Sequence, residues 1–314
     1  MQNQHAIFKV LVCGCTGGAF DSNLSCYLIA NKDFTKFLAL DAGSLLEGIS
    51  QVVKKNSLEE LNIALSSESF PEIDFLKNHV KAYVISHAHL DHVKGLVINS
   101  AVDQKKNIYG THTTINYLRD HLFNHKIWPN YANEGSQPLS LYHYVRLSLG
   151  EEYIIPEVEM SVETFLLEHS KGYSSSAFLI KSEDRYMMYF GDTSPDCLEK
   201  KKCLHTIWER IAPLIRQNIL RDIFIECSYP GDCSSECLFG HFNPGYLLQE
   251  LRHLAFLVEG TNLSCSLRNL RVYITHIKKQ QPGSRDLIIK ELEERNDLNV
   301  TFIFPSQGEI LYLS

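Results

Sequence analysis

The chain has 314 residues, of which 44% are hydrophobic and 21% are charged, a composition typical of a globular protein with a large core. Its 30 basic and 37 acidic residues give a net charge of -7, and no basic run is interleaved with aromatic residues. A protein that binds a long polyanion normally carries a positive face. The charge therefore argues against a large nucleic acid as partner and leaves a small anionic substrate open.

The amino-terminal stretch MQNQHAIFKVLVCGCTGG has neither the basic and apolar regions of a secretory signal nor a run long enough to cross a membrane. Nine cysteines, an odd number in a chain without such a signal, indicate reduced thiols. We therefore expect a cytoplasmic protein without a membrane partner.

The first half of the chain alternates strand and helix patterns. Strands are predicted over Phe8–Cys13, Ser25–Ala30, Phe37–Asp41 and Lys81–Ser86. A helical region is predicted over roughly Leu45–Leu65, and a second helix begins after Asp91. The following segment, Thr111–Tyr144, is rich in histidine and aromatic residues and is predicted to be partly helical.

The second half continues this alternation. Strands are predicted over Ser161–Leu167, Ala177–Lys181, Arg185–Gly191, Asp222–Cys227, Arg271–Thr275, Val300–Phe304 and Ile310–Leu313. Helices are predicted near Leu198–Gln217, Pro244–Val258 and Ser284–Arg295. Strands outnumber helices in both halves, as in an α/β protein with two packed sheets and outer helices. Because no repeat or linker divides the chain, we expect one domain over residues 1–314 with a partly helical insert at about 111–145.

A dense group of metal-binding residue types follows the strand pattern at Lys81–Ser86. In an extended loop, residues two apart project to one side, so His87 and His89 can share one metal ion. Asp91 and His92 follow where the chain turns into a helix and can face a second ion. Imidazole and carboxylate suit zinc, iron or manganese. Solvated loop histidines are the alternative interpretation, but such a concentration at a strand end is hard to explain by packing.

The pattern HxHxDH is the signature of the metallo-β-lactamase superfamily. The longer stretch His87–Ala101, HAHLDHVKGLVINSA, resembles the signature of the class II cyclic-nucleotide phosphodiesterases. The similarity extends through residues that bind no metal, namely Leu90, Val93, Gly95, Leu96 and Ser100. The resemblance implies a metallo-β-lactamase-like αββα sandwich of two packed mixed β-sheets with helices outside.

The resemblance also implies the remaining metal ligands. His169 resembles the third histidine of the first site, Asp192 in YFGDT resembles the carboxylate that bridges both ions, and His276 resembles the last ligand of the second site. A core histidine and a turn-forming aspartate are the alternatives for His169 and Asp192. The first site would then comprise His87, His89, His169 and Asp192, and the second Asp91, His92, Asp192 and His276.

Other residues resemble groups that assist the chemistry. His241 and Glu226 resemble a histidine and an acidic residue that help the leaving group depart. The sequence Gly-His-Phe-Asn-Pro around His241 departs from the family's more usual GHLTP, which puts a hydroxyl contact in doubt. The alternative for His241 is a local hydrogen bond at a helix start. Asp91 joins the catalytic set as a ligand rather than a free base, because a nearby dication keeps it ionised. Asp41 resembles an acidic residue that braces the histidine loop.

The function implied by the resemblance is hydrolysis of cAMP, with cGMP as an alternative, to the nucleoside 5′-monophosphate. Two divalent metal ions, zinc by preference with manganese or iron also suited, would share a hydroxide that attacks phosphorus. The partner would be this small cyclic nucleotide, and a homodimer is a further expectation. The aromatic stretch Leu122–Tyr131 either stacks on the purine or belongs to the core.

Two other functions fit parts of the pattern. Another phosphodiesterase of the superfamily, such as a tRNA 3′-endonuclease, is opposed by the acidic charge balance. A noncatalytic nucleotide sensor that uses metal ions structurally is opposed by the complete ligand set, which a sensor would not need.

Overall fold

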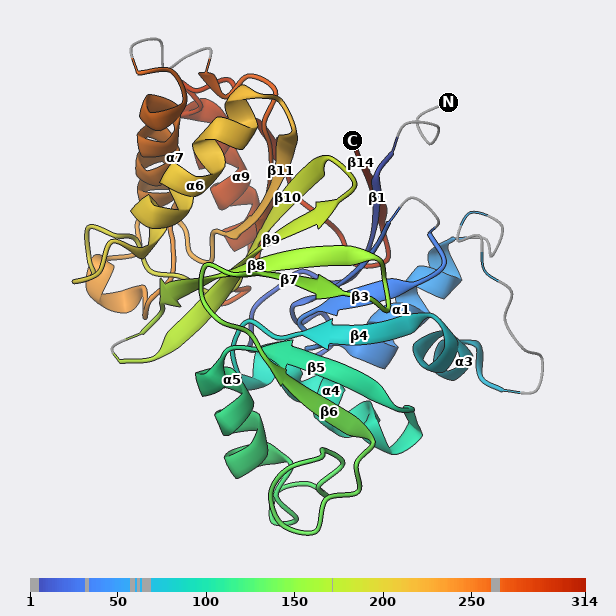
Figure 1. Cartoon of the computed structure of the whole chain (residues 1–314). Coiled ribbons are helices and arrows are strands. Elements are labelled where there is room, and N and C mark those ends of the chain that lie inside the picture. The colour runs from blue at the N-terminus through green and yellow to red at the C-terminus, as the bar shows by residue number, and fades with distance from the viewer. Residues whose placement is uncertain are drawn as a thin grey trace. The chain divides into compact units, whose positions relative to one another are not determined.

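The computed structural model describes residues 6–31, 34–56, 60, 63, 69–170, 172–260 and 266–314. It divides into two compact units (Figure 1). The first unit comprises Met1–Val162 and Ser306–Ser314, and the second comprises Glu163–Pro305. Each unit has its own sheet and its own hydrophobic cluster. The single domain expected over residues 1–314 stays a prediction.

The first unit contains a mixed seven-stranded sheet in the order β14-β1-β2-β3-β4-β5-β6. Strands β14, β1, β2 and β3 pair antiparallel, whereas β3, β4, β5 and β6 pair parallel. The strands are β1 (Phe8–Gly14), β2 (Cys26–Ala30), β3 (Phe37–Leu40), β4 (Val80–Val84), β5 (Lys106–Gly110), β6 (Tyr142–Arg146) and β14 (Ile310–Leu313). The parallel pairs need crossover connections, and these carry the helices.

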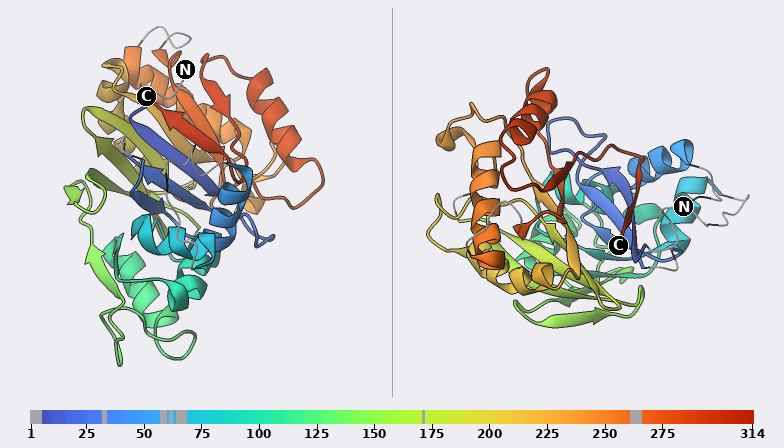
Figure 2. Two further views of the ribbon diagram at one scale, coloured as in Figure 1. Left: turned by 90° about the vertical axis from the view of Figure 1, so that its right-hand side faces the viewer. Right: turned by 90° about the horizontal axis from the view of Figure 1, so that it is seen from above.

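The helices of the first unit pack on its sheet through apolar faces. They are α1 (Leu45–Lys55), α3 (Pro71–Asn78), α4 (Leu90–Asn99), α5 (His112–Tyr117), the 3-10 turn η2 (Ser100–Val102) and the π-helix η3 (Leu118–Leu122). Figure 2 shows α1 and α3, in blue and cyan, beside the blue strands of the same unit. Of the helical region predicted at Leu45–Leu65, residues 57–59, 61–62 and 64–65 lie outside the described residues.

The second unit contains a mixed sheet in the order β13-β12-β11-β10-β9-β8. Strands β10 to β13 pair parallel, and β9 pairs antiparallel with β10. The strands are β8 (Met160–Glu168), β9 (Ser174–Ser182), β10 (Arg185–Phe190), β11 (Leu220–Glu226), β12 (Arg271–Thr275) and β13 (Thr301–Ile303), and β7 (Glu152–Ile155) precedes them in the chain. All the strands predicted for this half are present, with small differences at their ends.

The helices described in this unit are α6 (Cys203–Arg216), α7 (Pro244–Glu259) and α9 (Ser284–Glu294), with the 3-10 turn η4 (Ser235–Cys237) before α7. Their buried residues join the hydrophobic cluster around Trp208. The helix predicted from Leu198 begins only at Cys203. The reason is that the Asp196 carboxylate accepts hydrogen bonds from the backbone N–H groups of Leu204 and His205, at 3.0 and 2.9 Å, and so caps the helix there.

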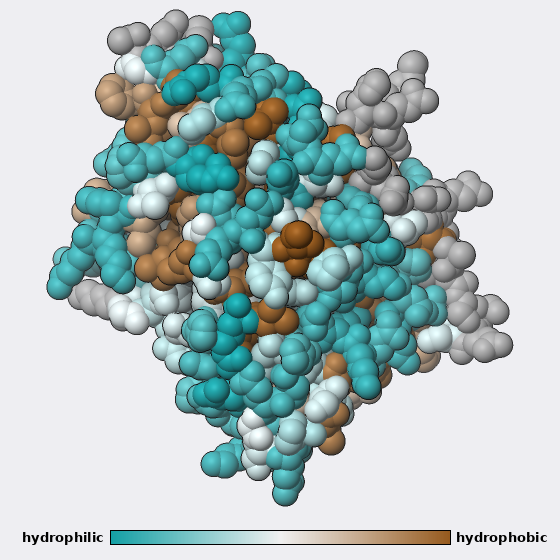
Figure 3. Space-filling model, in the orientation of Figure 1, coloured by the Kyte–Doolittle hydropathy of each residue, from teal (hydrophilic) through white to brown (hydrophobic). Residues whose placement is uncertain are grey.

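Polar side chains cover most of the face shown in Figure 3, and the apolar residues on it are scattered between them. No helix in the described part of the chain is long and apolar enough to cross a membrane.

A close approach between α4 and the loop after β3 fixes the direction of α4. The backbone N–H groups of Gly95 and Leu96 donate to the carbonyl oxygens of Gly43 and Ala42, at 3.0 and 3.1 Å. A Cβ atom at Gly95 would lie 2.6 Å from the carbonyl oxygen of Ala42 and 2.7 Å from the backbone nitrogen of Leu45. Only glycine therefore allows this contact, which explains a non-ligand position of the extended histidine motif.

We predict that Gly95→Ala lowers the free energy of unfolding by about 1–3 kcal/mol, because overpacking against rigid backbone outweighs the better helix propensity of alanine. Denaturant unfolding measures this change. Gly245→Ala in α7 is the control, since the closest atom to its added Cβ is the side-chain Asn243 Oδ1 at 3.3 Å. Equal stability of the two variants would contradict the packing argument.

Candidate metal centre

In the first unit, the histidine motif occupies the loop between β4 and α4. His89 is the N-cap of α4, and His92 lies in the first turn of that helix. The ring centroid of His87 lies 4.6 Å from that of His89 and 4.2 Å from that of His92. The Asp91 carboxylate accepts a hydrogen bond from the Gly18 backbone N–H at 3.2 Å. The strand end and the helix start thus gather all four residues expected from the motif.

Asp41 holds this loop in place from the end of β3. One carboxylate oxygen accepts the Ser86 backbone N–H, and the other accepts the Ser86 hydroxyl and His92 Nδ1, all at 2.8 Å. Asp41 itself has a φ of 55°, which few non-glycine residues adopt. The bracing contact predicted for Asp41 is confirmed.

These contacts determine which ring nitrogen of His87 and of His92 carries the lone pair. Because a carboxylate only accepts, His92 Nδ1 must donate to Asp41. The Ser86 hydroxyl donates to Asp41 and so accepts from His87 Nδ1 at 3.0 Å. Both rings are therefore held with Nδ1 protonated, which leaves the lone pair on Nε2, as in metal-binding histidines.

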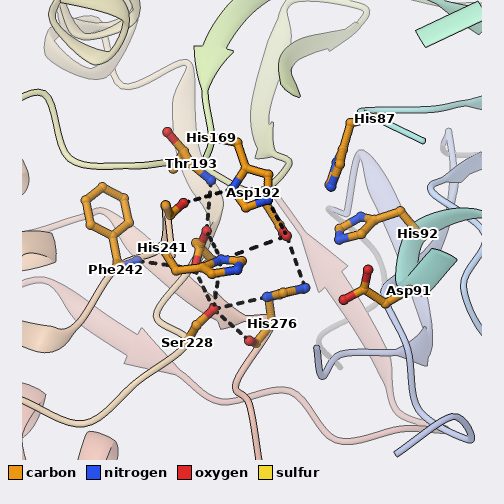
Figure 4. Close-up of polar contacts among 12 residues, drawn as sticks. His87, Asp91, His92, His169, Asp192, Thr193, Ser228, His241, Phe242 and His276 are labelled. Carbon is orange, nitrogen blue, oxygen red and sulfur yellow. Dashed lines mark hydrogen bonds and ion pairs between the residues drawn. The ribbon is translucent and has the colours of Figure 1, made fainter. Parts of the chain in front are cut away.

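In the second unit, the expected residues follow the ends of three alternate strands of one sheet. His169 follows β8, Asp192 follows β10, and His276 follows β12 (Figure 4). The Asp192 Oδ2 atom lies 3.3 Å from His276 Nε2 and 3.8 Å from His169 Nε2. Because β10, β11 and β12 are parallel, their carboxyl ends meet at one edge of the sheet.

In the second unit, His169 and His276 are also held by hydrogen bonds at Nδ1. His169 Nδ1 donates to the Gly240 carbonyl oxygen at 2.9 Å, and His276 Nδ1 lies 3.0 Å from the Ser228 hydroxyl. Ser228 donates to Glu226 at 2.5 Å and therefore accepts from His276. Burial lowers the pKa of His169, which favours the neutral imidazole that binds metal. Each ring again keeps its lone pair on Nε2.

Glu226 and His241 form a buried pair beside these ligands. His241 Nδ1 lies 2.8 and 3.0 Å from the two Glu226 carboxylate oxygens. Glu226 also accepts from the backbone N–H groups of Thr193 and Phe242, at 2.8 and 3.3 Å. Burial, together with the nearby Asp192 charge, raises the pKa of Glu226 to about 7. The pair is thus arranged to hold a proton close to neutral pH.

Each unit gathers the candidate residues that belong to it, and their binding of metal ions stays a prediction. Sequence reasoning missed Ser86, Ser228 and Gly240, which orient the histidines, and Gly18, which donates to Asp91. Ser86 and Gly240 directly precede the predicted site histidines His87 and His241, so their place in the sequence could have indicated that they lie at the site. Nothing in the sequence linked Ser228 to His276, because 48 residues separate them.

The aromatic stretch Leu122–Tyr131 contributes to the core of the first unit. Phe123 is completely buried in the hydrophobic cluster, and Trp128 packs against that cluster while its indole N–H donates to Ser100 Oγ at 3.0 Å. The core interpretation therefore holds for these two rings.

Comparison with known proteins relates the whole chain to one enzyme family. The model of the class II cAMP phosphodiesterases matches residues 8–308. A 3′,5′-cyclic-nucleotide phosphodiesterase from Aliivibrio fischeri is 40% identical, over 98% of this chain and 93% of the relative. A probable 3′,5′-cyclic-nucleotide phosphodiesterase from Yersinia pestis is 38% identical, over 97% of this chain and 89% of the relative.

Solved structures bear on the fold. The unliganded yeast PDE1 matches with a TM-score of 0.85 at 23% identity, covering 98% of this chain and 100% of the other. A metallo-β-lactamase fold protein from Bacillus subtilis, YhfI, matches with a TM-score of 0.62 at 16% identity, covering 97% and 98% of the two chains. The metallo-β-lactamase-like fold class predicted from the sequence is confirmed.

We predict that Gly240→Ala lowers both bound metal and turnover. A Cβ atom at Gly240 would lie 2.3 Å from the Ser170 backbone nitrogen and 2.8 Å from the His169 carbonyl carbon. The variant must therefore shift His169, and disturbing such an orienting contact typically costs about 10–100-fold in metal affinity or activity. Metal analysis and steady-state kinetics measure the effect.

Gly260→Ala is the matched control for this prediction. Gly260 has a φ of 77°, close to the 82° of Gly240, but a Cβ atom there would meet no atom of the described residues within 4 Å. Both variants carry the same left-handed backbone penalty, and only Gly240→Ala disturbs His169. If Gly260→Ala lost as much metal, backbone strain rather than the His169 contact would be responsible.

Proposed function

Because the chain belongs to the class II cAMP phosphodiesterase family and is a 3′,5′-cyclic-nucleotide phosphodiesterase, we propose that it hydrolyses cAMP to the 5′-monophosphate with two divalent metal ions. The family resemblance of His87–Ala101 is confirmed. The observation that supports the metal-dependent part is that four histidines, His87, His92, His169 and His276, each have a hydrogen bond at Nδ1, which places the imidazole lone pair on Nε2.

The donor set fits divalent metal ions. Neutral imidazole nitrogens and aspartate oxygens are ligands that zinc prefers, and manganese and iron accept them as well. We assign the first ion to His87, His89, His169 and Asp192, and the second ion to Asp91, His92, Asp192 and His276. Bound there, the two ions would lower the pKa of water toward neutrality and neutralise charge on the phosphoryl oxygens.

His241 supplies the proton that the leaving group needs. The 3′ oxygen of the substrate departs as an alkoxide, which is a poor leaving group unless it is protonated. His241 Nδ1 is engaged by Glu226 at 2.8 Å, so Nε2 is the atom that hands over the proton. A carboxylate behind the imidazole stabilises the protonated ring and keeps its orientation. Glu226 is therefore a positioning residue.

The cytoplasmic location and the homodimer are not needed for this activity and stay predictions from the sequence. So does the choice of cAMP over cGMP, which depends on how the base is bound.

The test of the proposed function is turnover of cAMP by protein whose metal content is measured on the same sample. We expect about two divalent ions per chain, conversion of cAMP to the 5′-monophosphate, and loss of activity with a chelator that zinc restores. His89→Ala should lose metal and at least about 100-fold in kcat/KM, since a direct ligand matters more than an orienting contact.

His112→Ala is the control for this substitution, because His112 is exposed at the start of α5 and has no assigned role. Product chromatography separates the two monophosphates. Formation of the 3′-monophosphate, or undiminished turnover by metal-free protein, would refute the proposal.

We further predict that His241→Ala lowers kcat for cAMP by roughly 10²–10⁴-fold, the usual contribution of a general acid, while bound metal is retained. Bis(4-nitrophenyl) phosphate provides the comparison, because its nitrophenolate leaves without a proton. Its hydrolysis should fall far less. Equal losses on the two substrates would show that His241 acts on the metal ligands instead of the leaving oxygen.

A further inference from the structure

The second unit contains a cavity of about 540 Å3 next to its candidate ligands. Ser170 and Gly240 line it, and they are the chain neighbours of His169 and His241. The Gly240 carbonyl oxygen also accepts the hydrogen bond from His169 Nδ1 at 2.9 Å. Small-molecule sites typically measure roughly 300–1,000 Å3. The cavity is therefore large enough for part of a nucleotide and adjoins the residues proposed to act on phosphate.

An aromatic ring of unusual exposure and backbone conformation lines this cavity. Phe239 is 65% exposed, although large apolar side chains are normally buried. Its φ is 51°, a left-handed conformation that a bulky residue rarely adopts, and Gly240 follows with a φ of 82°. Such conformations are concentrated at binding and catalytic sites. An exposed phenyl ring beside a cavity provides a flat face on which another aromatic ring can stack.

The charge of the lining indicates which part of a nucleotide it accepts. Glu199 and Glu236 line the cavity together with Ser170, Ser194 and Ser235, and none of the described lining residues is cationic. Carboxylates repel a phosphate group, whereas they accept hydrogen bonds from the N–H groups of a base. The lining thus disfavours the phosphate and suits the nucleobase.

We propose that this cavity binds the purine base of the cyclic nucleotide and that Phe239 stacks on it. The inference rests on the proposed function, because it assumes that the phosphate is bound by the histidine and aspartate ligands. The negative lining then helps to orient the substrate, with the base in the cavity and the phosphate directed to the His169 and His241 side. Phe239 becomes a determinant of substrate affinity, separate from the proton transfer by His241.

The test compares Phe239→Ala, Phe239→Leu and Phe239→Trp in metal-loaded protein. Stacking of a base on an aromatic ring is worth about 1–3 kcal/mol, so loss of the ring should raise KM for cAMP by roughly tenfold or more. The kcat and the metal content should stay close to those of the unsubstituted protein. Tryptophan should restore KM, whereas leucine, which is apolar but has no π-face, should not.

Two controls isolate the base. Phe256→Ala removes a phenylalanine that is 58% exposed on α7 and does not line the cavity, and it should leave KM unchanged. Ribose 3′,5′-cyclic phosphate without a base should be hydrolysed with the same kcat/KM by the unsubstituted protein and by Phe239→Ala. Melting temperatures identify any variant that fails to fold. If Phe239→Ala fails to fold, Phe239→Leu and Phe239→Trp still test the proposal.

The outcomes separate the two levels of the proposal. If the unsubstituted protein hydrolyses cAMP and both Phe239→Ala and Phe239→Leu keep its KM, the base site is refuted while the proposed function stands. If the variants lose as much kcat/KM on the cyclic phosphate without a base as on cAMP, Phe239 acts through the neighbouring histidine loop, and the base site is again refuted. If the unsubstituted protein hydrolyses no cyclic nucleotide, the proposed function fails and the base site fails with it.

Discussion

Hydrogen bonds to Nδ1 atoms are the constraint on which the candidate metal centre depends. An imidazole can present either nitrogen, and a ring that is free to rotate binds metal less well than one held in a single tautomer and orientation. In the first unit, Ser86 holds His87 and Asp41 holds His92. In the second unit, Gly240 holds His169 and Ser228 holds His276. The acceptors differ in chemistry, but each places the imidazole lone pair on Nε2, the atom that would bind an ion. The same device therefore occurs in each unit.

Two buried carboxylates, one in each unit, perform related tasks at the ends of strands. Asp41 follows β3, and its carboxylate accepts hydrogen bonds from a backbone N–H, a hydroxyl and an imidazole. Glu226 ends β11 and accepts from the same three kinds of donor. A buried carboxylate is stable only when its lone pairs are satisfied, so each one fixes the loop that supplies its donors. Carboxylates at the ends of rigid strands thus fix the positions of the loop side chains that bind to them.

The sequence located the candidate ligands far better than it located the residues that orient them. His87, His89, Asp91 and His92 are adjacent in the chain, and strand patterns placed Asp192 and His276 at strand ends, where side chains emerge from a sheet edge. The contact between His169 and Gly240 spans 71 residues, and no local pattern encodes it. Strands β5, β6 and β7 and helix α3 were not predicted. β5 and β6 carry polar residues such as Lys106 and His143, and β7 is largely exposed, so apolar periodicity is weak there.

The distribution of charge explains how an acidic protein can act on an anion. With a net charge of -7, the chain offers no general attraction for phosphate, so productive binding depends on positive charge placed locally. Two divalent ions on histidine and aspartate ligands would provide it, and they would also offset the repulsion from Asp91, Asp192 and Glu226. Glu199 and Glu236, which line the adjacent cavity, would then disfavour a reversed substrate. Attraction at one end and repulsion at the other would select a single orientation, which would place the 3′ oxygen rather than the base at His241.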